Sequence, residues 1–272
     1  MDEQIIAIYC LCDDLLRAMP YQANPQCQMS DAEVMTTAIV AALYFGANFE
    51  CARALLRQRQ YMPTMLSRSR LNRRLHRIKS LFLTLFCLLA ESWKELNRDS
   101  IYCIDTFPIA VCDNWRIKRA KIYQEARYHG YIASKKRYFY GLKIHLMITQ
   151  AGQPVEFFLT PGSFADVAGL PLFDFDLPEG SEVYGDRAFN DYTIEDVLAE
   201  AGIRLLPLRK QNSKRPLPPW LTAWVAHHRK MVETAGSLIA RKLPKSIHAV
   251  TAAGFELKVV LFVLGLSINY AL

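Results

Sequence analysis

The hydrophobic periodicity of this chain changes near residue 99, and that change constrains its fold more than any other feature. Before residue 99, apolar residues recur at helical spacing, whereas after it short β-prone runs alternate with further helical segments. This order predicts an α/β chain with two domains. Residues 1–98 are expected to form an all-α domain, and residues 99–272 a mixed sheet flanked by helices.

Helical signals fill the first domain. Apolar residues at 5, 8, 12, 15 and 19 form one stripe, which stops at Pro20. Ser30 and Glu33 form a capping box, which predicts a second helix that ends near Gly46. Further helices are predicted over 49–58, 67–79 and 80–97.

The helix predicted over 67–79 is strongly basic. Its apolar stripe of Leu71, Leu75 and Ile78 can pack on other helices, which leaves the basic side chains outward. These are Arg68, Arg70, Arg73, Arg74 and Arg77. A basic helix after a helix and a short helix favours a helix-turn-helix-like module, whose last helix contacts DNA. A basic face that is merely solvated is the alternative.

Strands are predicted from residue 100 onward. The runs 100–105, 137–149 and 154–160 predict an antiparallel meander. The predicted segments that follow are a short helix over 166–172, a strand over 181–186, a helix over 191–201, a strand over 203–208 and a helix over 220–242. A meander followed by alternating helices and strands is the order of a ribonuclease-H-like sheet.

Positive charge is concentrated between the first two predicted strands. The formal net charge is +7 and the pI is about 9.0, which favours an anionic partner such as nucleic acid, a membrane surface or an acidic protein. The basic residues of this run include Arg116, Lys118, Arg119, Lys135, Lys136 and Arg137. We predict that they form a sequence-independent track for DNA phosphates close to Asp105, because the strand that they precede is expected to lie next to the strand that carries it.

The cysteines and the apolar runs point to a cytoplasmic protein without a membrane partner. Seven cysteines are scattered without a CxxC pair, which argues against a disulfide framework or a zinc ribbon. The N-terminus carries acidic residues where a secretory signal has basic ones. The apolar runs 81–90 and 259–268 are about half of the ~20 residues that span a bilayer, so we expect buried helices there.

Two aspartates follow apolar runs at the expected ends of strands. Asp105 follows IYCI, and Asp186 follows EVYG. A carboxylate at the end of a buried strand is costly unless a cation or donor compensates it. A turn or cap residue is the other interpretation of Asp105, whereas Asp191 is the one expected to cap the helix 191–201.

Glu233 is the third candidate, on the last predicted helix. Arg229 and Glu233 are four residues apart, so an exposed ion pair is the simpler interpretation. The other acids of the last third are Glu195, Asp196, Glu200 and Glu256. Clustered carboxylates are ligands that Mg²⁺ and Mn²⁺ prefer.

Four sequence blocks carry a family resemblance. They are IDTFPI (104–109), GLKIHLMITQAGQPVEFFLTPGSFADV (141–167), YGDRAFND (184–191) and HRKMVETAGSLI (228–239). In order and spacing they resemble the DDE-class transposases of bacterial insertion sequences, over roughly 99–265. The resemblance implies that Asp105, Asp186 and Glu233 are the catalytic and metal-binding triad. Asp166 matches a recurrent acid, which we expect to act as a helix cap or to support the metal ligands.

The resemblance also implies DNA contacts near the triad. Arg229 matches the arginine of a Tyr, Arg, Glu and Lys signature found on the last helix of larger subfamilies. Ala226 and Ala240 stand where that signature has Tyr and Lys. Arg187, Arg229, Arg241 and Lys242 are therefore expected to contact DNA phosphates.

The activity implied is DNA transposition. Mg²⁺, for which Mn²⁺ can substitute, would support cleavage at the element's ends and transfer of the 3′-OH to target DNA. The expected partners are the terminal inverted repeats and target DNA, bound by a homodimer. Two alternatives remain open, namely a ribonuclease-H-like nuclease without strand transfer and a catalytically idle DNA-binding derivative.

Overall fold

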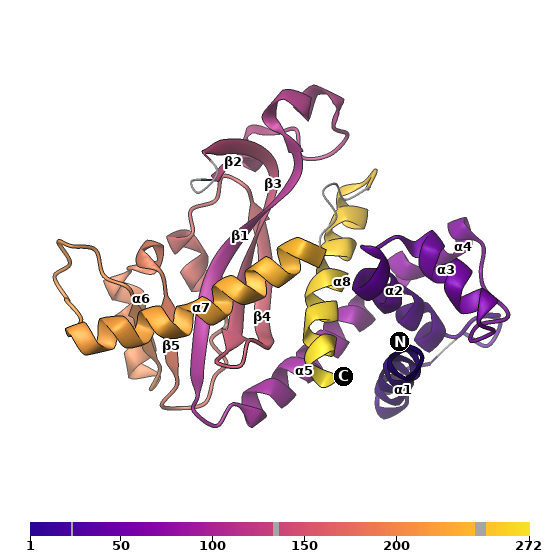
Figure 1. Ribbon diagram of the computed structural model, residues 1–272, viewed down its shortest axis with the longest axis horizontal. Coiled ribbons are helices and arrows are strands. Elements are labelled where there is room, and N and C mark those ends of the chain that lie inside the picture. The colour runs from indigo at the N-terminus through magenta and orange to yellow at the C-terminus, as the bar shows by residue number, and fades with distance from the viewer. Residues whose placement is uncertain (23, 133–135, 243–248) are drawn as a thin grey trace. The chain divides into compact units, whose positions relative to one another are not determined.

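The computed structural model describes residues 1–272 except 23, 133–135 and 243–248 (Figure 1). The chain forms two compact units, one of Met1–Leu89 with Ile239–Leu272 and one of Ala90–Leu238. The C-terminal segment thus groups with the N-terminal helices, whereas the sequence pattern had assigned it to the second domain. The domain limits at 98 and 99 themselves stay a prediction.

The first unit is helical. Its helices are α1 (Asp2–Ala18), α2 (Asp31–Phe45), α3 (Phe49–Gln58), α4 (Arg68–Arg77), the first part of α5 (Lys79–Leu96) and α8 (Ala252–Ala271). The capping box is confirmed, because Ser30 Oγ accepts from Glu33 N and Glu33 accepts from Ser30 N. Gly46 ends α2 with a φ of 54°. The helices are as predicted, but the helix-turn-helix assignment stays a prediction.

Two apolar helices, α2 and α8, build the core of this unit by packing on each other. α8 has 20 residues, about twice the apolar run 259–268, and by length and composition it could cross a membrane. However, 61% of its most apolar window is buried by the protein, as in a soluble core helix.

The second unit is built on a six-stranded mixed sheet. The strands are β1 (Ile101–Asp113), β2 (His129–Ile132), β3 (Arg137–Thr149), β4 (Pro154–Pro161), β5 (Glu182–Gly185) and β6 (Arg204–Pro207). Their order is β2-β3-β1-β5-β6, and β4 also pairs with β3. β1, β3 and β4 are antiparallel, whereas β5 and β6 extend β1 in parallel. A mixed sheet with its meander first is what the sequence predicts for a ribonuclease-H-like core.

β1 is longer than the sequence predicts. We expected it to end at Asp105, but it pairs with β3 as far as Asp113. This longer strand includes Pro108, which cannot donate a backbone hydrogen bond. The described pairing of β1 with β5 stops at Cys103, so Pro108 lies where one side of β1 has no neighbouring strand and a missing donor is tolerated.

Two helices belong to this sheet. α6 (Tyr192–Glu200) connects β5 to β6, and Asp191 caps it as predicted by accepting from Thr193 N and Ile194 N. α7 (Pro219–Lys242) follows β6 and lies across β1 and β5 (Figure 1). Short 3₁₀ helices fill the loops: η1 (Asn114–Arg119), η2 (Ala126–Tyr128), η4 (Val167–Leu172) and η5 (Arg187–Phe189).

Candidate active site

Asp105 and Asp186 lie side by side on neighbouring parallel strands. Cys103 of β1 pairs with Tyr184 of β5, and each aspartate comes two residues later in its strand or just beyond it. Because side chains alternate along a strand, both aspartates share the face of Cys103 and Tyr184. One oxygen of each is held locally, Asp105 Oδ1 by Thr106 N at 2.8 Å and Asp186 Oδ1 by Ala188 N at 2.7 Å.

The same face carries α7. Leu221, Val225, His228 and Val232 form a buried stripe along this helix. Cys103 Sγ donates to the His228 carbonyl at 3.4 Å, and Trp224 Nε1 donates to Tyr184 Oη at 2.9 Å. These contacts fix α7 directly over the strand positions that precede the two aspartates.

Arg229 and Glu233 lie on α7 directly after His228 and Val232 of this stripe. With Asp105 and Asp186 they form the candidate cluster. Arg229 Nη2 lies 3.9 Å from Asp105 Oδ2 and 3.3 Å from Glu233 Oε1. The Arg229 side chain is only 14% exposed, whereas that of Glu233 is 57% exposed. Arg229 is thus a cation between two acids, not the surface half of an exposed pair. Sequence spacing suggested its partnership with Glu233 but gave no sign of the contact with Asp105.

Within this cluster, the pKa of Asp105 is the one that is clearly shifted. Burial raises its pKa from 3.8 to about 7, while the Thr106 N–H and the Arg229 charge act in the lowering direction. The negative charges of Asp186 and Glu233 raise it further. Asp105 therefore lies near both other acids of the predicted triad, in a place where negative charge is incompletely compensated.

The competing acids have structural partners. Glu195 on α6 forms an ion pair with Arg209 at 2.5 Å, and Asp196 forms one with Arg215 at 2.8 Å. Asp166 lies at the N-cap position of η4, but its side chain makes no capping bond and accepts from Lys143 Nζ at 2.8 Å instead. Ion pairing explains Glu195, Asp196 and Asp166 without catalysis.

A buried polar group on the opposite face of β1 escaped the sequence reasoning. Thr106 Oγ1 and Thr160 Oγ1 lie 3.2 and 2.9 Å from the two ring nitrogens of His145. Gly169 leaves room for this ring, because a Cβ there would lie 2.4 Å from His145 Cε1. Burial lowers the His145 pKa to about 4, so the ring is neutral and hydrogen-bonded. The network fixes β1 beside Asp105; the lone histidine in an alternating strand gave little signal for it.

The carboxylates of Asp105, Asp186 and Glu233 are the type of ligand that binds a divalent cation. Among the described residues no three His, Cys, Asp or Glu side chains are arranged to hold a metal ion. The donor set is nevertheless the oxygen-rich type that Mg²⁺ and Mn²⁺ prefer. In the structure the Arg229 guanidinium lies between Asp105 and Glu233 and supplies positive charge there.

The predicted DNA-contacting residues of α4 divide into different environments. Arg68, Arg70, Arg73 and Arg77 are exposed. Arg74 differs, because its guanidinium pairs with the buried carboxylate of Asp31 and its side chain is 12% exposed. A second bond to the Met29 carbonyl also ties α4 to the start of α2. Arg74 thus holds the helical unit together.

The described basic residues at the start of β3 lie far from Asp105. Asp105 pairs with Leu146, and Arg137 is nine residues from Leu146 along β3, which corresponds to about 30 Å. The prediction that Lys136 and Arg137 lie beside the active site is therefore wrong. β1 continues past Asp105 to Asp113, and Phe139 near the start of β3 pairs with that far end, whereas β3 itself has the predicted length. Lys118 and Arg119 are exposed on η1, and Lys136 and Arg137 are exposed near the start of β3.

Several predicted contacts are only partly described. Arg187 is exposed on η5, directly after Asp186. Arg241 and Lys242 end α7, but their side chains lie outside the described part of the chain, as does that of Arg116. Lys135 lies wholly outside it. Their contacts with DNA stay predictions.

Comparison with known proteins assigns the family. A family model described as a transposase DDE domain matches residues 96–246, which include all three candidate acids. The match covers more than half of the chain, so the protein belongs to this transposase DDE domain family.

One solved structure that resembles the chain is the cryo-EM structure of the piggyBac transposase synaptic complex with hairpin DNA. The sequence identity is 10% and the TM-score is 0.47. The alignment covers 100% of this chain and 66% of that chain, so this protein spans just under two thirds of that relative. No curated protein matches.

Proposed function

We propose that the protein cuts DNA at the ends of its own element and joins the resulting 3′-OH to target DNA. The observation that carries the proposal is the meeting of Asp105 and Asp186 under α7, with Arg229 between Asp105 and Glu233. Each of these residues lies within the matched transposase domain. In this proposal the element is an insertion sequence, and the protein acts in the bacterial cytoplasm.

Two successive displacements at phosphorus make up the reaction. In the first, water attacks the phosphodiester, the P–O3′ bond breaks, and the leaving oxygen takes a proton to become a 3′-OH. In the second, that 3′-OH attacks a target phosphodiester, so one P–O bond forms as another breaks. No covalent link to the protein is required.

Asp105, Asp186 and Glu233 would together hold the divalent cations. Two Mg²⁺ or Mn²⁺ ions would supply the positive charge that activates the attacking oxygen and stabilises the leaving one. The protein's part is to fix the carboxylates, and Thr106 N and Ala188 N do this by holding one oxygen of each aspartate. Arg229 would neutralise the cluster before metal binding and can then pair with a DNA phosphate.

DNA is the proposed partner, recognised by the exposed basic residues of α4 and followed along its backbone by the basic run at the start of β3. Terminal repeats and target DNA would be bound by a homodimer, since transposition joins two ends. A nuclease without strand transfer is the second candidate, because hydrolysis needs the same acids.

The test uses the full-length protein and a duplex carrying the inverted repeats that flank its gene. In Mg²⁺ we expect cleavage at the repeat and a joined product with plasmid DNA, and EDTA should remove both. Cleavage without a joined product would replace this proposal with the nuclease. Binding without cleavage in either Mg²⁺ or Mn²⁺ would leave only a DNA-binding derivative.

A further inference from the structure

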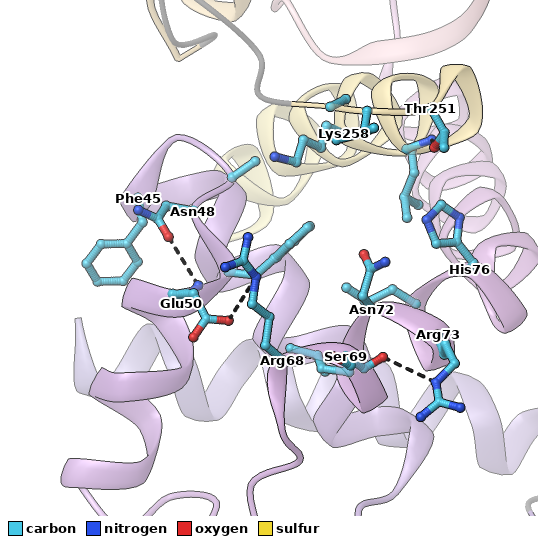
Figure 2. A pocket seen from close by; sticks show the side chains of 18 of the residues that line it. Phe45, Asn48, Glu50, Arg68, Ser69, Asn72, Arg73, His76, Thr251 and Lys258 are labelled. Carbon is cyan, nitrogen blue, oxygen red and sulfur yellow. Dashed lines mark hydrogen bonds and ion pairs between the residues drawn. The ribbon is translucent and has the colours of Figure 1, made fainter. Parts of the chain in front are cut away.

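A cavity of about 930 Å³ lies within the helical unit, between α3 and α4 on one side and the start of α8 on the other (Figure 2). α4 contributes Arg68, Asn72 and His76, which recur every four residues and so share one face of the helix. α8 contributes Lys258, about two turns beyond Thr251 at its N-cap. Residues almost two hundred positions apart therefore line one space.

The cavity carries excess positive charge. Among its described lining residues, Arg68, Arg73 and Lys258 are cationic and Glu50 is the one acid. Glu50 is already paired with Arg53 at 2.6 Å, while Arg68 lies 4.0 Å from it. Burial lowers the Lys258 pKa, and the Arg68 charge lowers it further. Such a space favours an anionic ligand.

The start of α8 adds to this preference. Thr251 Oγ1 accepts from Gly254 N, and the N-terminal end of a 20-residue helix attracts negative charge. Figure 2 shows Lys258 and Thr251 on α8 across the cavity from Arg68 and Asn72. Cations and neutral donors that face one another across a space are the usual groups for binding phosphate oxygens.

The positive surface also continues beyond the cavity. Arg73 lines it and also lines a neighbouring hollow with Arg70 and Arg77. The Arg68 side chain is 83% exposed, so the opening is accessible to a long ligand. A continuous run of cations across α4 fits the backbone of a nucleic acid better than a single small anion.

We propose that this cavity binds a phosphodiester segment of DNA, and that Lys258 on α8 acts with Arg68 on α4 to hold it. The inference rests on the proposed DNA-processing function and adds to it a role for the C-terminal helix. A free nucleotide or phosphate has the same chemistry and is the alternative source of the ligand.

The test measures DNA binding by the full-length protein in EDTA, so that catalysis plays no part. Arg68→Gln and Lys258→Gln should each weaken binding of a labelled duplex roughly tenfold at about 0.1 M salt. Each should also flatten the salt dependence by about 0.9 in the slope of log K against log salt. Arg57→Gln, an exposed arginine on α3 outside the cavity lining, is the matched control and should bind like the wild type.

Lys258→Arg keeps the charge and should keep both affinity and slope, which separates a phosphate contact from damage to α8. Wild-type slopes for both Gln variants would overturn the proposal. It would also be overturned if ATP raised the melting temperature only when Lys258 is present, with DNA binding unaffected by the variants, because the ligand would then be a free nucleotide. Either result leaves cleavage in Mg²⁺ untouched, so failure of the transposase proposal would be seen separately.

Discussion

Glu195 and Asp105 are both poorly exposed carboxylates of the sheet unit, but their charges are compensated differently. Glu195 accepts from both Nη atoms of Arg209, at 2.5 and 2.9 Å. Asp105 has Arg229 at 3.9 Å and two other acids nearby, and its pKa rises to about 7. The comparison teaches that a buried carboxylate whose charge is fully paired by donors stabilises the fold. A buried carboxylate whose charge is only partly paired is a candidate for binding a ligand.

The largest expected difference between the two groups of acids is in DNA cleavage. Asp105→Asn, Asp186→Asn and Glu233→Gln should each lower DNA cleavage in Mg²⁺ by at least about 100-fold, because an amide keeps the shape but loses the charge that holds a cation. Glu200→Gln, another exposed glutamate on a helix, should cleave like the wild type. Near-normal cleavage by Glu233→Gln would remove Glu233 from the triad.

The second difference is in stability against pH. The folded-state pKa of Asp105 is raised from 3.8 to about 7, so its contribution to stability is fully present below about pH 4 and is lost as the pH rises through 7. Asp105→Asn should therefore be more stable than the wild type above pH 7 in EDTA, by at most about 4 kcal/mol, with little difference near pH 4. Denaturant unfolding across this pH range checks it, and parallel pH profiles would contradict it.

Glu195, Asp196, Arg209 and Arg215 form a compensated cluster of ion pairs. Breaking it should lower the stability of the protein and leave DNA cleavage unchanged. Glu195→Gln removes the charge beside Arg209, whose side chain is 9% exposed, and should lower the free energy of unfolding by about 3 kcal/mol. Cleavage per folded molecule should stay unchanged. A loss of cleavage without a loss of stability would mean that Glu195, not Asp105, belongs to the catalytic group.

The smallest effect is expected at the rim of the compensated cluster. Asp196 pairs with Arg215 at 2.8 Å, but its side chain is 63% exposed. Water screens such a pair, so Asp196→Asn should leave the melting temperature unchanged at moderate salt. A marked fall in the melting temperature would show that this pair stabilises the protein although the Asp196 side chain is exposed.

Local signals in the sequence predicted most elements. The capping box at Ser30 and Glu33 and the cap at Asp191 identified helix starts, because capping is a contact between residues two or three apart. The end of β1 was mispredicted, because the apolar residues 109–112 were not read as strand, whereas pairing with β3 holds them in it. Strand length depends on partners distant in the chain.

The candidate site was predictable in its acids but not in its cation. Asp105 and Asp186 stand after apolar strand residues, and the resemblance to DDE-class transposases pointed to Glu233. Two arginines were misjudged in opposite ways: Arg229 approaches Asp105, and Arg74 is buried against Asp31. Composition shows that an arginine is present, and only packing decides whether its charge meets solvent, an acid or a phosphate.

The sequence by itself determined the family and the order of helices and strands, and it proposed the three acids, since these follow from motifs and short-range periodicity. Tertiary structure alone decided that α7 lies over β1 and β5, that α8 joins the helical unit, and that Lys258 faces the cavity with Arg68. The reason is physical: these positions result from burying apolar faces that many partners could cover, and the choice among those partners depends on the packing of the whole unit.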